Sequence, residues 1–165
     1  MAISITIGGP HVVAFPTKIR SGNCGHVLNL TLQQDLDNGA IRGVGAWIEL
    51  DNYKDAAPAS GNGAAIFQGI IRGKSARGNY YVEVTADTTD VWVYQDPIIP
   101  EAGYGRKFAK EENFYNASGD VVRAYTLCKY DIFEVSKEAF TTTPTKASIG
   151  KTVTANAAGK LVIGN

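Results

Sequence analysis

The side chains able to bind metals or act as nucleophiles are few in this chain of 165 residues. The imidazole and thiol groups are those of His11, Cys24, His26 and Cys128. Cys24 and His26 form a Cys-x-His pair, but structural zinc sites use ligands paired two and two. A Cys–His nucleophile pair needs a third orienting group and an oxyanion hole, and neighbouring residues supply neither. We therefore predict no metal, no cofactor and no catalytic residue.

Carboxylates are the second candidate chemistry, because a pair of Asp or Glu side chains can hydrolyse glycosidic bonds. Glu111 and Glu112 are adjacent, and adjacent residues of a strand point to opposite faces of a sheet. Asp131 and Glu134 flank two apolar residues, and we interpret them as part of a solvated strand edge. A pair assembled from distant strands stays open, so a carboxylate-dependent glycan hydrolase is one alternative function.

The remaining motifs do not indicate a site for phosphate or nucleic acid. The segment Gly61-Asn62-Gly63 lacks the Lys-Ser/Thr that follows in a P-loop. Basic residues gather near two turns, at Arg72, Lys74 and Arg77 and at Arg106, Lys107 and Lys110. Nucleic-acid-binding proteins usually carry a basic excess, whereas this chain has 16 basic and 16 acidic residues. We interpret the basic turns as solvated loops and predict no nucleic-acid partner.

Apolar and polar residues alternate along much of the chain, a pattern typical of β-strands. Strands are therefore the elements that must position the polar side chains described above. Gly, Asn, Asp and Pro clusters interrupt the alternation every 8–12 residues or so. The sequence therefore predicts an all-β fold, a sandwich or barrel of roughly ten short strands with long loops, in one domain spanning residues 1–165. The clearest strand segments are 2–7, 25–33, 40–50, 65–72, 80–86, 91–95, 121–130, 132–135, 151–155 and 160–163.

Several local features refine this prediction. Segments 80–86 and 91–95 are expected to form a central hairpin, and 151–155 with 160–163 a second one. Residues 51–63, rich in Ala, Gly, Asn and Pro, are expected to form a mobile loop, and 136–140 one capped helical turn. We interpret four aromatic residues as half-buried core, with a sugar-binding platform as the alternative; they are Trp47, Trp92, Tyr94 and Phe133.

Targeting signals are not evident in the chain. The first residues have neither a basic segment nor a continuous apolar run, so we predict no signal peptide. No stretch approaches the ~20 apolar residues that cross a bilayer, so we predict no membrane association. The protein is expected to be cytoplasmic when synthesised, and Cys24 and Cys128 are expected to be free thiols.

Three stretches in the second half of the chain carry a distinctive order of residues. They are Val91-Trp92-Val93-Tyr94-Gln95-Asp96-Pro97, the run 108–116 containing Asn113-Phe114-Tyr115-Asn116, and 119–125 beginning Gly119-Asp120. In this order they resemble small head proteins of tailed bacteriophages. Asp131-Ile132-Phe133 and Ser136-Lys137-Glu138-Ala139-Phe140 follow in the order seen in those families. The closing segments Ser148-Ile149-Gly150-Lys151 and Gly159-Lys160-Leu161 are similar to small β-domains of capsid decoration proteins.

This resemblance, which covers roughly the last 75 residues, implies a decoration (cement) protein. Such a protein binds the outside of an assembled capsid and stabilises it by bridging capsomers, without catalysis or cofactor. The implied partner is the major capsid protein, and the implied locations are the virion surface and, during assembly, the host cytoplasm. A host-adhesion or glycan-binding β-module is the alternative reading of the same chain.

The first nine residues form an expected N-terminal arm. Ile3, Ile5 and Ile7 make an apolar stripe that alternates with Ser4 and Thr6 and ends at Gly8-Gly9-Pro10. A free strand of this kind exposes unpaired backbone groups, which soluble proteins normally cover. We predict that the stripe contacts the capsid or another copy of the chain, with a trimer favoured. The alternative is an ordinary first strand that pairs within its own domain.

Overall fold

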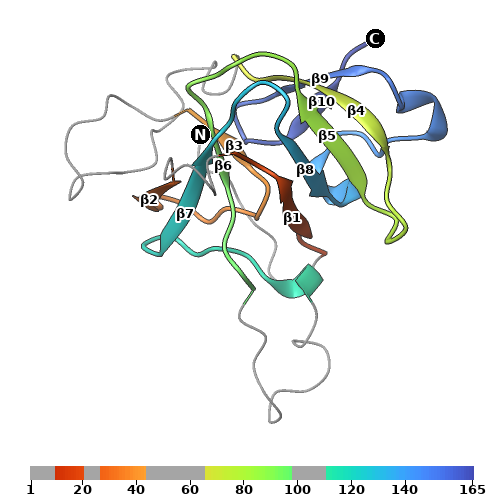
Figure 1. Cartoon of the computed structure of the whole chain (residues 1–165). Coiled ribbons are helices and arrows are strands. Elements are labelled where there is room, and N and C mark those ends of the chain that lie inside the picture. The colour runs from red at the N-terminus through yellow and green to blue at the C-terminus, as the bar shows by residue number, and fades with distance from the viewer. Residues whose placement is uncertain (1–9, 21–26, 44–65, 98–110) are drawn as a thin grey trace.

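The computed structural model describes residues 10–20, 27–43, 66–97 and 111–165. Within these ranges the chain forms ten strands in two antiparallel sheets and three short 3-10 turns, with no α-helix. The predicted all-β fold with about ten short strands is confirmed, and the two sheets make a sandwich (Figure 1).

The larger sheet has the strand order β1-β8-β5-β4-β9-β10. Its strands are β1 (Ala14–Lys18), β4 (Gln68–Lys74), β5 (Tyr80–Val84), β8 (Ile132–Val135), β9 (Thr152–Ala155) and β10 (Leu161–Ile163). The smaller sheet has the order β2-β7-β6-β3. Its strands are β2 (Val27–Thr31), β3 (Ile41–Arg42), β6 (Val91–Val93) and β7 (Val121–Thr126).

The main core lies between the two sheets, and alternation along the strands selects its members. On β6, Trp92 points into this core together with Tyr94, which follows the strand, whereas Val91 and Val93 point to the opposite face. That opposite face carries a second buried cluster, which includes Leu28 of β2. Strand β6 is therefore buried on both faces. Trp92, Tyr94 and Phe133 are more deeply buried than the half-buried positions predicted for them.

The expected central hairpin of segments 80–86 and 91–95 is wrong. β5 pairs with β4 and β8 in the larger sheet, whereas β6 pairs with β7 and β3 in the smaller one. The link between them, residues 85–90, crosses from one sheet to the other instead of closing a tight turn. Both segments present an apolar face to the same core, so alternation alone does not distinguish the two arrangements.

The predicted C-terminal hairpin is confirmed, with Leu161 opposite Ala155. Its turn needs glycine at Gly159, where φ is +78° and a Cβ atom would lie 3.0 Å from the Ile41 carbonyl oxygen. The Gly159 carbonyl accepts a hydrogen bond from the Ile41 N–H. The turn of one sheet is thereby fastened to β3 of the other.

The predicted helical turn at 136–140 is present as the 3-10 turn η4 (Lys137–Ala139). Ser136 occupies the N-cap position but its side chain does not cap the turn; its hydroxyl accepts a hydrogen bond from the Val13 N–H instead. The other two turns are η3 (Glu111–Asn113) and η5 (Lys146–Ser148). The predicted loop at 51–63, the whole of the predicted arm at 1–9 and Trp47 lie outside the described residues.

Candidate functional site

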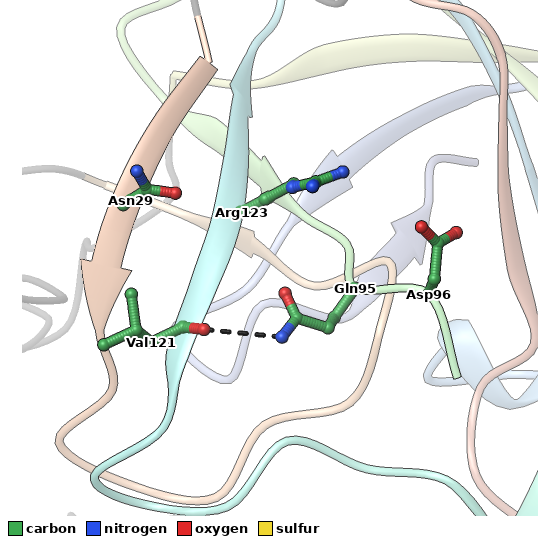
Figure 2. A pocket seen from close by; sticks show the side chains of 5 residues that line it. All are labelled: Asn29, Gln95, Asp96, Val121 and Arg123. Carbon is green, nitrogen blue, oxygen red and sulfur yellow. Dashed lines mark hydrogen bonds between the residues drawn. The ribbon is translucent and has the colours of Figure 1, made fainter. Parts of the chain in front are cut away.

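A polar pocket lies beside the smaller sheet, at the end where β2 finishes and β7 begins (Figure 2). Its volume is about 320 Å³, and it is lined by Asn29, Gln95, Asp96, Val121 and Arg123. Asn29 on β2 stands directly opposite Arg123 on β7, so the strand register itself brings this amide and guanidinium together. Four of the five lining side chains can form hydrogen bonds, so the pocket wall offers donors and acceptors to a polar ligand.

Buried asparagines hold the Gln95 side of this pocket in place. The Asn38 side-chain amide donates to the Gln95 carbonyl oxygen at 2.8 Å and accepts from the Gln95 N–H at 3.0 Å. Asn116 donates from its side chain to the Asn38 side-chain oxygen at 3.0 Å and to the Leu36 carbonyl at 3.2 Å. Because Asn38 and Asn116 are buried, these bonds fix the backbone beside the pocket.

The polar groups at the pocket wall differ in how firmly they are held. The Tyr94 hydroxyl donates to Asp96 Oδ1 at 3.1 Å, and the Tyr94 ring is stacked on Trp92. The Gln95 side chain donates to the Val121 carbonyl at 3.4 Å. Figure 2 shows the Arg123 side chain reaching from β7 toward the segment that carries Gln95 and Asp96. Its guanidinium pairs with no carboxylate in the described part of the chain, so its donors are available to a ligand.

The histidines and cysteines that the sequence singled out do not form one site in the described residues. His11 Nδ1 lies 2.7 Å from Asp37 Oδ1, and its ring is 5.1 Å from that of Tyr115, so His11 joins two loops. Cys128 is half-buried. Cys24 and His26 lie outside the described residues. No group of three His, Cys, Asp or Glu side chains suited to a metal occurs in the ranges that the structure describes.

The interpretation of Asp131 and Glu134 as a solvated strand edge is wrong, since both are buried. Asp131 accepts hydrogen bonds from the backbone N–H groups of Arg20 and Cys128. Glu134 Oε1 accepts from Ser75 Oγ at 2.7 Å and from the Asn79 side chain at 3.0 Å. The β4–β5 turn supplies both donors to Glu134, a long-range packing feature that local alternation does not reveal.

The basic turn near residue 72 is part of a network of surface contacts. Arg72 donates two hydrogen bonds to the Glu83 carboxylate, at 2.7 and 2.9 Å. These bonds raise the pKa of Arg72 and lower that of Glu83. The Arg77 guanidinium lies 4.6 Å from the centre of the Phe15 ring. The Lys74 ammonium lies 5.7 Å from the centre of the Tyr80 ring, so all three basic groups of this turn make contacts within the chain.

One buried carboxylate is not matched by donors. Neither carboxylate oxygen of Asp90 makes a hydrogen bond of normal geometry, and the indole N–H of Trp92 is likewise unpaired. Strand alternation puts Asp90 on the same face as Trp92. Burial raises the pKa of Asp90, and the nearby Phe67 N–H and Thr88 hydroxyl offset this only in part.

Replacing Asp90 with asparagine is expected to stabilise the protein at pH 7, by about 1 kcal/mol, because a buried charge is removed. A carboxyl whose pKa is raised by folding favours the folded state below its unfolded pKa, and this contribution is lost as the pH rises through the folded-state pKa. The gain from Asp90→Asn should therefore grow from mildly acidic to neutral pH. Thermal unfolding across this range measures it.

Asp87→Asn is the matched control for this prediction, because Asp87 is exposed and the amide oxygen can still accept from the Lys129 N–H. Its unfolding temperature should show no such growing difference from the parent protein. A loss of stability in Asp90→Asn at neutral pH would mean that the Asp90 carboxylate is needed in its charged form.

Comparisons with known proteins do not add an assignment to this site. No protein-family model, no curated protein and no solved structure matches the chain. Among the described residues, no helix has the length and apolar character needed to span a membrane. The sequence does not predict the pocket residues Asn29, Gln95, Asp96 and Arg123 as a site, because they belong to no chemical motif and come together only in the folded chain.

Proposed function

We propose that this protein is a structural virion component that binds the outside of an assembled phage capsid and stabilises it by bridging capsomers. The proposal rests on the resemblance of residues 91–161 to phage head and decoration proteins. It is supported by an all-β body in which two of the three described buried carboxylates, Asp131 and Glu134, serve as hydrogen-bond acceptors within the fold.

The observation that carries the proposal is the attachment of the chain just after the apolar stripe of Ile3, Ile5 and Ile7. The His11 N–H donates to the Glu112 carbonyl at 2.6 Å, and the His11 ring is bonded to Asp37. Val12 is buried, and Val13 exchanges hydrogen bonds with Ser136 before β1 begins.

From His11 onward the chain is thus held to the body by contacts among the described residues. A short apolar segment that is followed by a firmly held one, here residues 11–13, is suited to adding as a strand to a partner. Many weak contacts of this kind on a repeating capsid lattice add up through avidity. In this proposal the stripe makes the contacts, and the two-sheet body sets the spacing between them.

Deleting residues 1–9 is expected to leave a folded body that no longer decorates capsids, with at least a tenfold loss of apparent affinity, on the order of the avidity gain of multivalent binding. The measurement is co-sedimentation with capsids of the virus that encodes this chain, stripped of the protein. Full-length protein should sediment with assembled capsids and not with unassembled subunits.

The full-length variant Ser4→Ala, which keeps the apolar stripe, is the control and should bind like the parent protein. Circular dichroism of the truncated chain separates loss of binding from loss of folding. If the truncated chain is unfolded, or if it decorates capsids as well as the full chain, the arm does not have this role.

Glycan binding is the second candidate function, and the polar pocket favours it. Amides, a carboxylate and an unpaired guanidinium around 320 Å³ offer donors and acceptors for sugar hydroxyl and carboxylate groups. Arg123→Ala should then abolish retention on immobilised host surface polysaccharide without changing capsid binding. Equal retention of Arg123→Ala and the parent protein would remove this candidate.

A further inference from the structure

The two sheets present four edge strands in the described residues, and three of them are protected against pairing with another chain. β1 contains Pro16 and has a register shift between Phe15 and Lys18. β3 is only two residues long. The outer side of β10 is met by Phe140, which forms a bridge to Leu161, and by the N–H of Thr141. Proline, bulges, shortness and coverage are the usual devices that block edge pairing.

The fourth edge, β2, shows none of these devices within the ranges that the structure describes. It is five residues long, its sequence is VLNLT, and it contains no proline, glycine or charged residue. Its only strand partner in the described residues is β7. An edge of this length and composition is a template for an added strand.

Hydrogen bonds at the strand end identify which backbone groups face outward. The Leu32 N–H donates to Asp120 and the Leu32 carbonyl accepts from Gly119, so Leu32 faces the β7 side. On β7, the Arg123 carbonyl accepts a hydrogen bond from the Tyr94 N–H, on the side away from β2. The backbone groups of the residues on either side of Arg123 therefore face β2. Because direction alternates along a strand, the N–H and C=O groups of Val27, Asn29 and Thr31 point away from β7.

The two faces of β2 differ in polarity along the same edge. Leu28 and Leu30 belong to the apolar cluster on one face. Asn29 and Thr31 lie on the other face, where Asn29 stands beside Arg123 in the polar pocket. A strand added to β2 would therefore fit best with apolar side chains on one face and small polar side chains on the other.

We propose that the outer edge of β2 accepts residues 2–7 of a second copy of this chain. Their alternation matches both faces: Ile3, Ile5 and Ile7 continue the row of Leu28 and Leu30, and Ser4 and Thr6 continue the row of Asn29 and Thr31. The two segments also match in length, since residues 2–7 are six residues and β2 is five. The inference builds on the arm of the proposed function but not on the capsid as its target.

Donor and acceptor are different surfaces, so this contact is heterologous and is completed only when copies close into a ring. In a closed ring every arm and every β2 edge is paired. A three-membered ring would be the trimer predicted from the sequence.

The test mixes two full-length populations, both with Cys24 and Cys128 replaced by serine. One carries Thr31→Cys and the other carries Ser4→Cys or Thr6→Cys, so a disulfide between them joins two chains. Mild oxidation should give a mixed covalent dimer with at least one of these partners. The control partner Ile5→Cys, whose side chain would lie on the opposite face, should give about fivefold less, because the faces alternate.

A second measurement uses the backbone. Asn29→Pro removes an outward N–H and no hydrogen bond of the β2–β7 ladder, whereas Asn29→Thr keeps that N–H. Sedimentation velocity should show oligomers for the parent protein and Asn29→Thr, and monomers for Asn29→Pro. Ile5→Pro in the arm should also give monomers. If Asn29→Pro fails to fold, Ile5→Pro still tests the inference, because residue 5 belongs to the arm and not to the two-sheet body.

Absence of the mixed disulfide, equal cross-linking by Ile5→Cys, or a monomeric parent protein would overturn the inference. Capsid binding is scored separately on the same proteins. If the protein decorates capsids but forms no mixed disulfide, the proposed function stands and this inference is wrong. If it forms the mixed disulfide but does not decorate capsids, this inference stands and the proposed function is wrong.

Discussion

Trp92→Ala is expected to lower the free energy of unfolding by about 3–5 kcal/mol, the range for removing a large buried aromatic side chain. Trp92 is fully buried at the centre of the sandwich. Its ring lies 5.3 Å from Tyr94, 6.0 Å from Tyr125 and 5.4 Å from Phe133, measured between ring centres. Because Phe133 belongs to the larger sheet, this side chain joins the two sheets.

Urea unfolding followed by far-ultraviolet circular dichroism measures this change. Trp92→Phe is the matched control: it keeps an aromatic ring in the core and removes an indole N–H that has no partner. We expect it to cost clearly less than Trp92→Ala, about 1–2 kcal/mol. If both substitutions cost less than about 1 kcal/mol, the junction between the sheets does not depend on this ring.

Asn38→Ala is expected to cost about 3 kcal/mol, because it leaves several buried polar groups without partners at once. The Gln95 N–H and C=O would both lose the bonds they make to the Asn38 side chain, and Asn116 would lose one acceptor. Unsatisfied buried groups cost more than the net value of the bonds themselves. The same substitution should loosen the backbone of Gln95 beside the pocket.

Asn29→Ala is the control for this prediction, since Asn29 is an exposed asparagine of the same pocket. It should change the free energy of unfolding by no more than about 0.5 kcal/mol, as is usual at the surface. Amide hydrogen exchange at Gln95 should speed up in Asn38→Ala and stay unchanged in Asn29→Ala. Equal stability of the two variants would show that the buried network does not hold this loop.

The sequence by itself determined the fold class, because alternation is a local property that each strand displays along its own length. The segments at 80–84, 91–93 and 132–135 are strands, as their β-branched and aromatic residues predict. The hairpin of β9 and β10 could also be predicted, since both strands and the Asn156–Gly159 turn lie within twelve residues.

Only the tertiary structure decided which strands are neighbours. The segments around Tyr80 and Val91 are close in the chain and alike in pattern, yet they belong to different sheets. Glu134 looks solvated by local pattern, but a turn 55 to 59 residues away supplies its donors. In the same way, Asn29 faces Arg123 across 94 residues of sequence through the pairing of β2 with β7. Alternation specifies which face of a strand is apolar, whereas the partner of that strand depends on contacts between distant segments, and these form only when the whole core is packed.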